Sequence, residues 1–494
     1  MESLHHPGDS GGVSAPSSPT IKIEFNAGRC GAGKTRHVCE LMACEPGRYL
    51  FAVDRREVAA TRETAIAEFA GKHGTDPLVI HLYSHSNQHH EGVIGVRRRI
   101  REAACAYGIH EHVVIIVTHE GLKTSDLSTF SGWTLVIDEM PEIWSQSSIR
   151  TPAAYQYLRE VYRLVPAGGC WSQVIARAGT GITASDLHKD DLLGELAVFD
   201  RRVRDRGVFA NLPDWEAAAG GDSWSWFSIW NPAELSAFAR VVLVANAVEA
   251  SVAYKLIQTM FRDFVEFVPF EIGGPAVPYE PRNLTIRYFA CGHRAGTYFF
   301  NSDAGKENLK CVRKWLSDNL RADSYYWSSN IGLFGSSTPP GMAVRPRAAG
   351  RDDLKGYANC AMIYTAKPSD DDEEALGLLG VTREDVIRSR EFEDIYQMMW
   401  RGSLRNPGDP SCFVLYVYDR AQAEMQARLV SETGLPISVE IEHVDIGLDQ
   451  FERPMLGRPV KLVTDDEKAA KVERARERAR IRKRKSRAAK RQAP

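Results

Sequence analysis

Short runs of apolar residues alternate along the chain with longer stretches that mix polar and apolar positions. After residue 20 the first such run is "IKIEFNA", and four more follow: "RYLFAV" (48–53), "PLVIHLY" (77–83), "VVIIV" (113–117) and "WTLVI" (133–137). Continuous apolar runs separated by segments long enough for a helix are typical of buried strands in a parallel sheet. The pattern therefore predicts an α/β domain whose parallel sheet is flanked by helices.

The same pattern resumes after a long interruption at 144–239. The later runs are "RVVLVA" (240–245), "NLTIRYFA" (283–290), "CAMIYTA" (360–366) and "CFVLYVY" (412–418), with a helix expected at 307–320 and a long loop at 332–350. A chain of 494 residues is long enough for two or three domains. We expect two α/β domains, at about 20–260 and 261–445, with the interruption as an insertion in the first.

Composition excludes several classes of protein. No apolar run approaches the roughly 18 residues that a membrane-spanning helix needs. Residues 1–19 are polar and rich in Gly, Ser and Pro, which predicts a disordered leader rather than a signal peptide. The nine cysteines are scattered without a C-x-x-C pair, which favours a reducing compartment, cytoplasmic, nucleoid-associated or nuclear, over secretion.

The net charge of −2 conceals a strong asymmetry. Residues 468–494 contain 13 Lys or Arg and two Glu, a net charge of +11, so the rest of the chain carries −13. A basic tail on an acidic body is typical of an electrostatic arm for a polyanion. We expect residues 446–494 to form a linker and a tail that binds nucleic acid, with a merely solubilising charge run as the alternative.

The stretch "GRCGAGKT" (28–35) matches the phosphate-loop pattern G-x-x-x-x-G-K-[ST] and lies between an expected strand and an expected helix. Small residues let the backbone N–H groups surround a phosphate at the start of the helix. Lys34 would reach the β- and γ-phosphates, and the Thr35 hydroxyl would hold Mg²⁺. The residues expected to contact the nucleotide are Gly28, Gly31, Ala32, Gly33, Lys34 and Thr35.

The stretch "TLVIDEMPE" supplies a pair of acids at the end of an apolar strand. Asp138 would hold Mg²⁺ together with Thr35, and Glu139 would orient or deprotonate an attacking water. Two acids that cap the next helix are the alternative. That alternative is less favoured here, because the acid pair follows a phosphate loop by about a hundred residues and so has a partner motif for nucleotide binding.

With these two motifs the chain resembles the superfamily 2 helicases and translocases, over most of 20–445. Four weaker matches occur in the expected order: "IIVTHEGL" (115–122), "VVLVANAVEAS" (241–251) as motif III, "GRDDL" (350–354) as motif V and "QMMWRGSLRNP" (397–407) as motif VI. "DEMP" (138–141) would be their D-E-x-x motif, with Pro141 where many members have His or Asp. The resemblance implies two RecA-like P-loop NTPase domains that use ATP and Mg²⁺.

Motif VI bears on what the ATP is for. The stretch that ends in "QMMWRGSLR" looks helical up to Asn406, with Gln397 and Arg401 on one face and Arg405 four residues further on. The resemblance implies that these arginines face the γ-phosphate from the second domain and so make hydrolysis depend on domain closure. The second arginine follows Gln397 by eight residues rather than seven, so which arginine is the finger stays open. A solvated surface helix is the alternative.

Two residue clusters carry competing interpretations. Trp215, Trp224, Trp226 and Trp230 lie close together in the insertion. They are expected to form the core of a helical, aromatic subdomain, with base stacking as the alternative. His81, His85 and His89 recur every four residues, but histidines in a polar loop face solvent more often than they bind a metal.

The sequence favours an ATP-dependent helicase or translocase that acts on nucleic acid, DNA rather than RNA, through its inter-domain surface and the tail 468–494. One alternative is a P-loop switch or nucleotide kinase that uses Lys34 and Asp138 within one domain. Another is a non-catalytic nucleic-acid-binding protein with a degenerate ATPase fold. A packaging motor would add a nuclease, yet no clear metal-binding set of acids follows residue 283.

Overall fold

The computed structural model describes residues 21–83, 91–150, 155–177, 199–200, 202–204, 207–272, 278–335, 337–347 and 353–449. Several features expected from the sequence lie outside these residues: the leader 1–19, the basic tail 468–494, His85, His89 and the beginning of "GRDDL". Residues 1–446 form one compact unit, and a second begins at Gly447.

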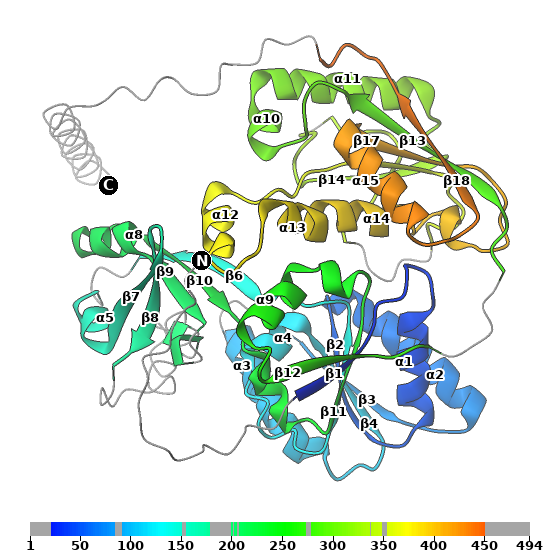
Figure 1. The fold of residues 1–494 in the computed structure, drawn as a ribbon. Coiled ribbons are helices and arrows are strands. Elements are labelled where there is room, and N and C mark those ends of the chain that lie inside the picture. Colours follow the sequence, from blue (N-terminus) through cyan, green and yellow to red (C-terminus); the bar gives the residue numbers. More distant parts are fainter. Residues whose placement is uncertain are drawn as a thin grey trace, which may run out of the picture. The chain divides into compact units, whose positions relative to one another are not determined.

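The first α/β domain is built on a seven-stranded sheet whose strand pairings are all parallel, in the order β12-β1-β11-β5-β2-β4-β3 (Figure 1). Its strands are β1 (Ile21–Asn26), β2 (Arg48–Val53), β3 (Leu78–Leu82), β4 (Val113–Thr118), β5 (Thr134–Asp138), β11 (Arg240–Val244) and β12 (Val265–Pro269). All of these strands except β12 coincide with apolar runs expected from the sequence, and the parallel α/β prediction is confirmed. Because β12 pairs with β1, this sheet continues past the boundary expected at residue 260.

Helices cover both faces of this sheet because successive strand residues point to opposite sides. On one face, Leu50 and Ile115 share a buried cluster with Ile100 and Leu256. On the other, Phe51 belongs to a cluster with the first two helices. The helices are α1 (Lys34–Cys44), α2 (Ala59–His73), α3 (Glu91–Tyr107), α4 (His119–Thr124) and α9 (Val252–Met260).

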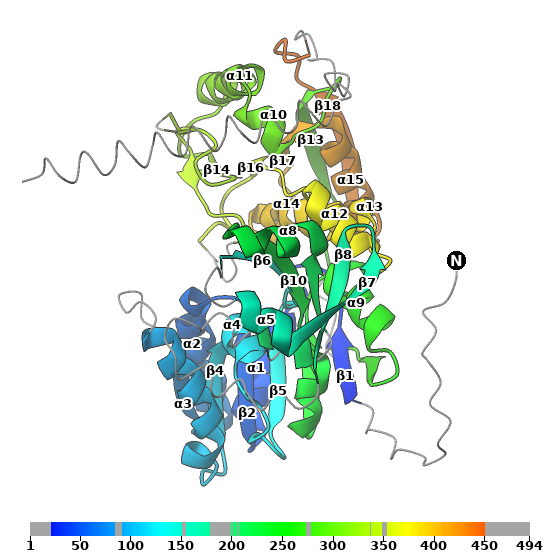
Figure 2. The same ribbon diagram turned by 90° about the vertical axis from the view of Figure 1, so that its left-hand side faces the viewer.

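The insertion is a five-stranded antiparallel sheet, in the order β6-β10-β9-β8-β7, and not the helical subdomain expected from the sequence (Figure 2). In "SWSWFSI", Trp224 and Trp226 point to one face and Phe227 to the other, which is the two-residue period of a strand and explains the correction. The elements are β6 (Trp144–Ile149), α5 (Tyr155–Val161), β7 (Tyr162–Gly168), β8 (Trp171–Ala176), β9 (Val208–Asn211), α8 (Leu212–Ala217) and β10 (Trp224–Ile229).

The four clustered tryptophans are core residues, as expected. Trp215, Trp224 and Trp226 are all at most 6% exposed and share one buried cluster of the insertion. Trp230, 2% exposed, belongs to the main core of the first domain. None of these four side chains is available for base stacking.

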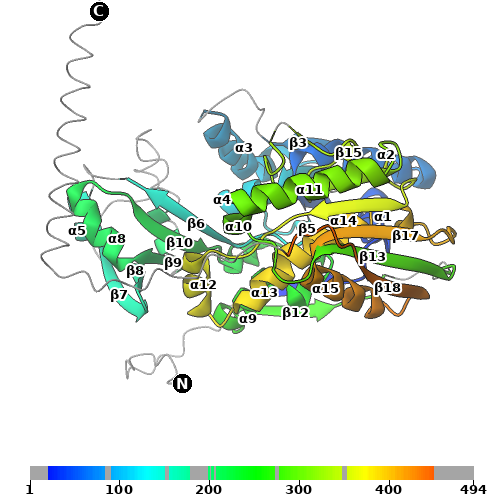
Figure 3. The same ribbon diagram turned by 90° about the horizontal axis from the view of Figure 1, so that it is seen from above.

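The second α/β domain is built on a six-stranded sheet whose strand pairings are again all parallel, in the order β15-β14-β16-β17-β13-β18 (Figure 3). Its strands are β13 (Arg282–Ala290), β14 (Tyr325–Ser329), β15 (Met342–Ala343), β16 (Asn359–Ile363), β17 (Phe413–Asp419) and β18 (Ile437–His443). Its helices are α10 (Thr297–Asn301), α11 (Asp303–Asn319), α12 (Asp370–Gly377), α13 (Arg383–Ile387), α14 (Glu393–Met399) and α15 (Arg420–Ser431). A second parallel α/β domain is therefore confirmed.

Within the described ranges, no helix combines the length and the apolar character that crossing a bilayer would require.

Candidate functional site

The phosphate loop connects β1 to α1 at the carboxyl end of the first sheet, the end at which open α/β sheets bind ligands. Gly31 and Gly33 adopt φ values of +78° and +82°, a conformation that glycine enters without steric cost. Gly31, Ala32 and Gly33 are exposed. The loop therefore presents bare backbone at the start of a helix, which is the surface that a phosphate group requires.

Lys34 lies beneath this loop and is only 9% exposed. Its Nζ donates hydrogen bonds to the backbone carbonyls of Gly28 and Arg29, the latter at 2.9 Å. These two carbonyls fix the Lys34 side chain beneath the loop. The geometry places one positive charge where a phosphate would lie.

Thr35 and Asp138 meet at the foot of the loop. The Thr35 hydroxyl donates to Asp138 Oδ1 at 2.7 Å, although the residues are 103 positions apart. Arg62 of α2 holds the other oxygen, with its Nη2 2.9 Å from Asp138 Oδ2. A hydroxyl and a carboxylate in contact offer the hard oxygen ligands that Mg²⁺ prefers, so this pair fits the expected cation.

His119 supports Asp138 from the other side. The buried imidazole donates from Nε2 to the Asp138 backbone carbonyl at 3.1 Å. Burial lowers the pKa of His119, which favours the neutral ring. His119 lies within the "IIVTHEGL" segment, but that pattern by itself assigns no role to the histidine. Arg62 carried no signal that sequence reasoning could use.

Glu139 follows Asp138 in a strained conformation. Its φ of +72° is uncommon for a residue with a side chain, and such strain often marks functional sites. Its N–H donates to the carbonyl of Val244 at 2.8 Å, so the end of β11 fixes this backbone. Burial raises the pKa of Glu139 to about 7, and neighbouring Asp138 adds to the rise, whereas Lys34 and Arg401 oppose it.

The motif VI segment differs from the single helix expected. It runs through α13, a π-helical turn (Arg388–Phe392) and α14, but α14 ends at Met399. The Tyr326 hydroxyl donates to the Met398 carbonyl at 2.8 Å. A β-carbon at Gly402 would lie 2.8 Å from the Tyr357 carbonyl oxygen, so the chain turns at this glycine.

Arg401 and Arg405 are consequently placed by a turn and a 3₁₀ turn (Ser403–Arg405) rather than by helical periodicity. The expectation that Gln397 and Arg401 share a helix face is therefore wrong. Arg282 fixes the turn by donating to the backbone carbonyls of Ser403, at 3.0 Å, and Asn406.

Both arginines nevertheless face the first domain. A β-carbon on Gly31 would lie 3.1 Å from Cγ of Arg405, so this side chain lies directly on the phosphate loop. Burial lowers the pKa of Arg401, and the negative charge of Glu139 opposes that shift. The structure thus brings together the loop, the acid pair and both arginines, as the sequence led us to expect.

Additional contacts join the phosphate loop to the second domain. The Arg29 guanidinium of the phosphate loop lies over the rings of Tyr279 and Trp400, at 5.1 Å and 5.9 Å from their centroids. The neighbouring Cys30 packs against the apolar core of the second domain. Two variable positions of the loop pattern therefore anchor the second domain, which the pattern alone does not reveal.

A carboxylate that sequence reasoning missed links motif III to motif VI. Glu393 Oε1 accepts from Asn246 Nδ2 at 2.7 Å and from Gln397 Nε2 at 2.9 Å. Asn246 follows β11 in "ANA", where the family pattern has S-A-T. Glu139, Asn246, Glu393 and Gln397 line one cavity between the two α/β domains. Gln397 is thus connected to Asn246 of the first domain by hydrogen bonds to Glu393.

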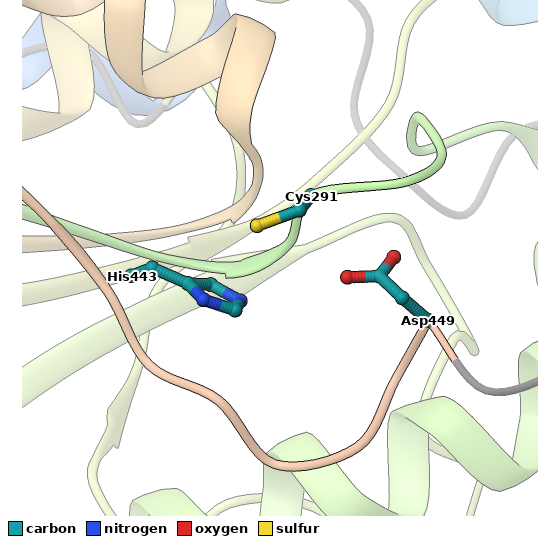
Figure 4. A group of neighbouring side chains, drawn as sticks. All are labelled: Cys291, His443 and Asp449. Atoms are coloured by element: carbon teal, nitrogen blue, oxygen red, sulfur yellow. The ribbon is translucent and has the colours of Figure 1, made fainter.

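Of the three histidines considered as a possible metal cluster, His81 lies among the described residues, and His85 and His89 lie outside them. His81 contacts Tyr83, with Nδ1 3.2 Å from the hydroxyl, and its Nε2 lies 3.4 Å from Glu63. Figure 4 draws three side chains among the described residues that could each offer one ligand atom to a metal: Cys291, His443 and Asp449. All three are exposed, and Asp449 belongs to the unit that begins at Gly447, so we assign no metal site to them.

No protein-family model matches the chain, and no curated protein matches it in sequence. Solved structures do match. Xpd4 of S. tokodaii aligns over 86% of this chain and 96% of its own, at 13% identity and a TM-score of 0.41. S. cerevisiae Dbp5 bound to RNA and ADP BeF3 aligns over 86% of each chain, at 11% identity and a TM-score of 0.34. The DUF1998 helicase MrfA bound to DNA aligns over 86% of this chain and 50% of its own, at 11% identity and a TM-score of 0.33.

At TM-scores below 0.5 these likenesses carry no argument about function. The topology itself agrees with the fold expected from the sequence: two parallel α/β domains, with the phosphate loop in the first and the arginine-bearing turn in the second. Any conclusion about activity rests on the geometry of the junction.

Proposed function

We propose that this protein is an ATP-dependent helicase or translocase that hydrolyses ATP between its two α/β domains to move along or remodel nucleic acid. The observation that carries the proposal is the position of Arg405 on Gly31 of the phosphate loop, with Arg401 close enough to interact with Glu139. Residues from two domains converge on one loop, so closing the domains would complete the site.

Each residue has a distinct task in this proposal. The loop N–H groups and Lys34 bind the phosphates, and Glu139 orients and deprotonates the attacking water. Arg401 and Arg405 stabilise the charge that develops on the transferred phosphoryl group. Thr35 and Asp138 would hold Mg²⁺, which neutralises phosphate charge when bound.

A single-domain switch or kinase explains this arrangement less well, because neither would need two arginines and a glutamine from a second parallel domain at its loop. A degenerate, non-catalytic fold would not need to keep Lys34, Thr35, Asp138 and Glu139 together. The nucleic acid is proposed to be DNA rather than RNA, bound by the inter-domain surface and the tail 468–494. A cytoplasmic, nucleoid-associated or nuclear location is part of the same proposal.

The decisive experiment is ATP hydrolysis by the full chain with Mg²⁺, alone and with single-stranded DNA, double-stranded DNA or RNA. We expect hydrolysis that at least one nucleic acid stimulates. Lys34→Ala is the matched control and should lose ATP binding, because it removes the loop's buried charge. Absence of hydrolysis under all four conditions, or equal hydrolysis by Lys34→Ala, would refute the proposal.

A further inference from the structure

The inserted sheet has two buried faces. Trp224, Trp226 and Val208 point to one face, into the core of the insertion itself. The alternate residues Trp171, Phe209 and Phe227 point to the other, with the Phe209 and Phe227 rings stacked at 4.8 Å. If the insertion packed only against itself, this second face would be exposed to solvent. The residues that cover it therefore show which part of the chain the insertion contacts.

That face shares its buried cluster with the first α/β domain and also with residues of the second. Five residues of α12, α13 and their connection belong to the same buried cluster as this second face: Ala375, Leu376, Leu379, Val381 and Val386. Each is at most 9% exposed. Chain inserted into the first domain therefore buries apolar surface contributed by the second domain.

A polar contact fixes the register of this junction. The turn between β7 and β8 reaches α12, where the Cys170 N–H donates to Glu374 Oε1 at 3.1 Å. The Cys170 thiol, 3.4 Å from Glu374 Oε2, donates to the second oxygen. Asn211 Nδ2 lies 3.1 Å from the same sulfur, so the turn is tied to β9 as well.

The turn 168–170 fits α12 closely because two of its three residues are glycines. Gly168 and Gly169 adopt φ values of +138° and +52°. A β-carbon on Gly169 would overlap the Glu374 carboxylate, and one on Gly168 would lie 2.7 Å from Leu378 Cδ2. A side chain at position 169 would displace the Glu374 carboxylate from the turn, and one at position 168 would displace the end of the Leu378 side chain.

From α12 the chain continues through residues 378–382 into a helical rod that leads to the candidate site. From Arg383 to Met399 the chain is continuously helical, about 25 Å at 1.5 Å per residue. The first domain holds its middle, since Lys255 of α9 pairs with Asp385 and the Val252 N–H donates to Ser389 Oγ at 3.1 Å. Its far end carries Glu393 and Gln397, followed by the arginine turn.

We propose that the inserted sheet is a positioning element for nucleotide hydrolysis: it supports the start of this helical rod and so sets how the far end meets the phosphate loop. This inference rests on the proposed function. The turn 168–170 and Glu374 touch no reacting group and act only through the rod. Weakening this contact should slow turnover while nucleotide binding by the first domain persists.

The test compares Gly169→Ala and Glu374→Ala with two controls. Gly74→Ala introduces the same left-handed strain, at a φ of +73°, where a β-carbon would meet nothing within 4 Å. Glu374→Gln keeps an oxygen that accepts from the Cys170 N–H. We expect kcat to fall about threefold to tenfold in the two test variants, the equivalent of the net contribution of one typical hydrogen bond, with the nucleotide Kd unchanged. Both controls should stay near the wild type.

Amide hydrogen exchange gives a readout that does not depend on activity. Peptides that cover 393–405 should exchange faster in Gly169→Ala and Glu374→Ala than in the two controls, whereas peptides from β4 should not change. Test variants with normal kcat, or with normal exchange at 393–405, would overturn the inference. A wild-type protein without ATPase activity would refute the proposed function instead, and the exchange comparison would then decide the role of the sheet alone.

Discussion

At the scale of single residues, the site depends on a few side chains whose surroundings differ from what their sequence neighbours suggest. Asp138 is held by Thr35, Arg62 and, through its backbone carbonyl, by His119. Glu139, one residue further on, turns away in a left-handed conformation. Adjacent carboxylates can thus take different tasks, one toward a cation and one toward a water.

This division predicts the behaviour of Glu139→Gln. The amide keeps the shape of the side chain but cannot accept a proton, so kcat should fall by about 10²- to 10⁴-fold. ATP affinity should persist, because the loop and Lys34 are intact. Single-turnover hydrolysis and an equilibrium titration with labelled nucleotide separate the two effects. A variant that hydrolyses ATP at the wild-type rate would exclude Glu139 as the base.

The two arginines yield a second prediction. Replacing the arginine that stabilises the transferred phosphoryl group should spare ATP binding and reduce kcat by about 10³-fold or more. Arg401→Ala and Arg405→Ala should be measured separately, because Arg405 lies on the loop and Arg401 faces Glu139. If both variants turn over normally, the arginine turn is only structural and the coupling of two domains through ATP fails.

At the scale of elements, the inserted sheet is stabilised by interlocking aromatic rings. Trp224 is fully buried, with its ring 4.7 Å from that of Trp215 and 5.3 Å from that of Phe199, both edge to face. Such contacts add to the burial of apolar area. Removing this ring should therefore destabilise the inserted sheet. The two parallel sheets should be affected less, because the ring does not belong to their cores.

Trp224→Ala should accordingly destabilise the inserted sheet by about 3–5 kcal/mol, the usual loss for a large aromatic residue truncated in a core. Denaturant unfolding followed by tryptophan fluorescence should show an earlier transition. Phe264→Ala is the control, because that ring is 43% exposed and should change stability by less than about 1 kcal/mol. Equal transitions for the two variants would contradict this assignment of the core.

At the scale of the whole molecule, charge is divided between an acidic body and a basic tail, residues 468–494. Lysines and arginines that neutralise phosphates release condensed counterions. The logarithm of the binding constant then falls with that of the salt concentration, by about 0.9 per duplex contact or 0.7 per single-strand contact. The tail should supply much of the sequence-independent affinity for nucleic acid.

A truncation after Thr464 tests this division. It should bind nucleic acid more weakly and with a shallower salt dependence, because most of the phosphate contacts are lost. ATP hydrolysis without nucleic acid should persist, since Lys34, Glu139 and both arginines remain. Binding titrations at several salt concentrations, for the full and truncated chains, give the two slopes. An identical slope would mean that the tail does not contact phosphates.

The sequence by itself determined the local elements and the motifs that lie on them. Apolar runs such as 48–53 and 113–117 became strands, because a continuous apolar segment is stable only when both faces of its strand are buried. The phosphate loop was also readable from sequence, since Gly31 and Gly33 answer a purely local backbone requirement. Features that depend only on neighbouring residues can be predicted from the sequence pattern.

Only the tertiary structure decided how distant segments meet. The helix before Arg401 ends at Met399, and the Ser403 N–H then donates to the carbonyl of Tyr357, a partner remote in the chain, at 2.8 Å. The roles of Arg62 and Glu393 also come from partners 76 and 147 positions away, Asp138 and Asn246. The inserted sheet could not be read as a support for the second domain, because its partner α12 lies about 200 residues further on. The periodicity of a sequence shows which side of a helix or strand is buried. Which other element packs against that side depends on the tertiary structure.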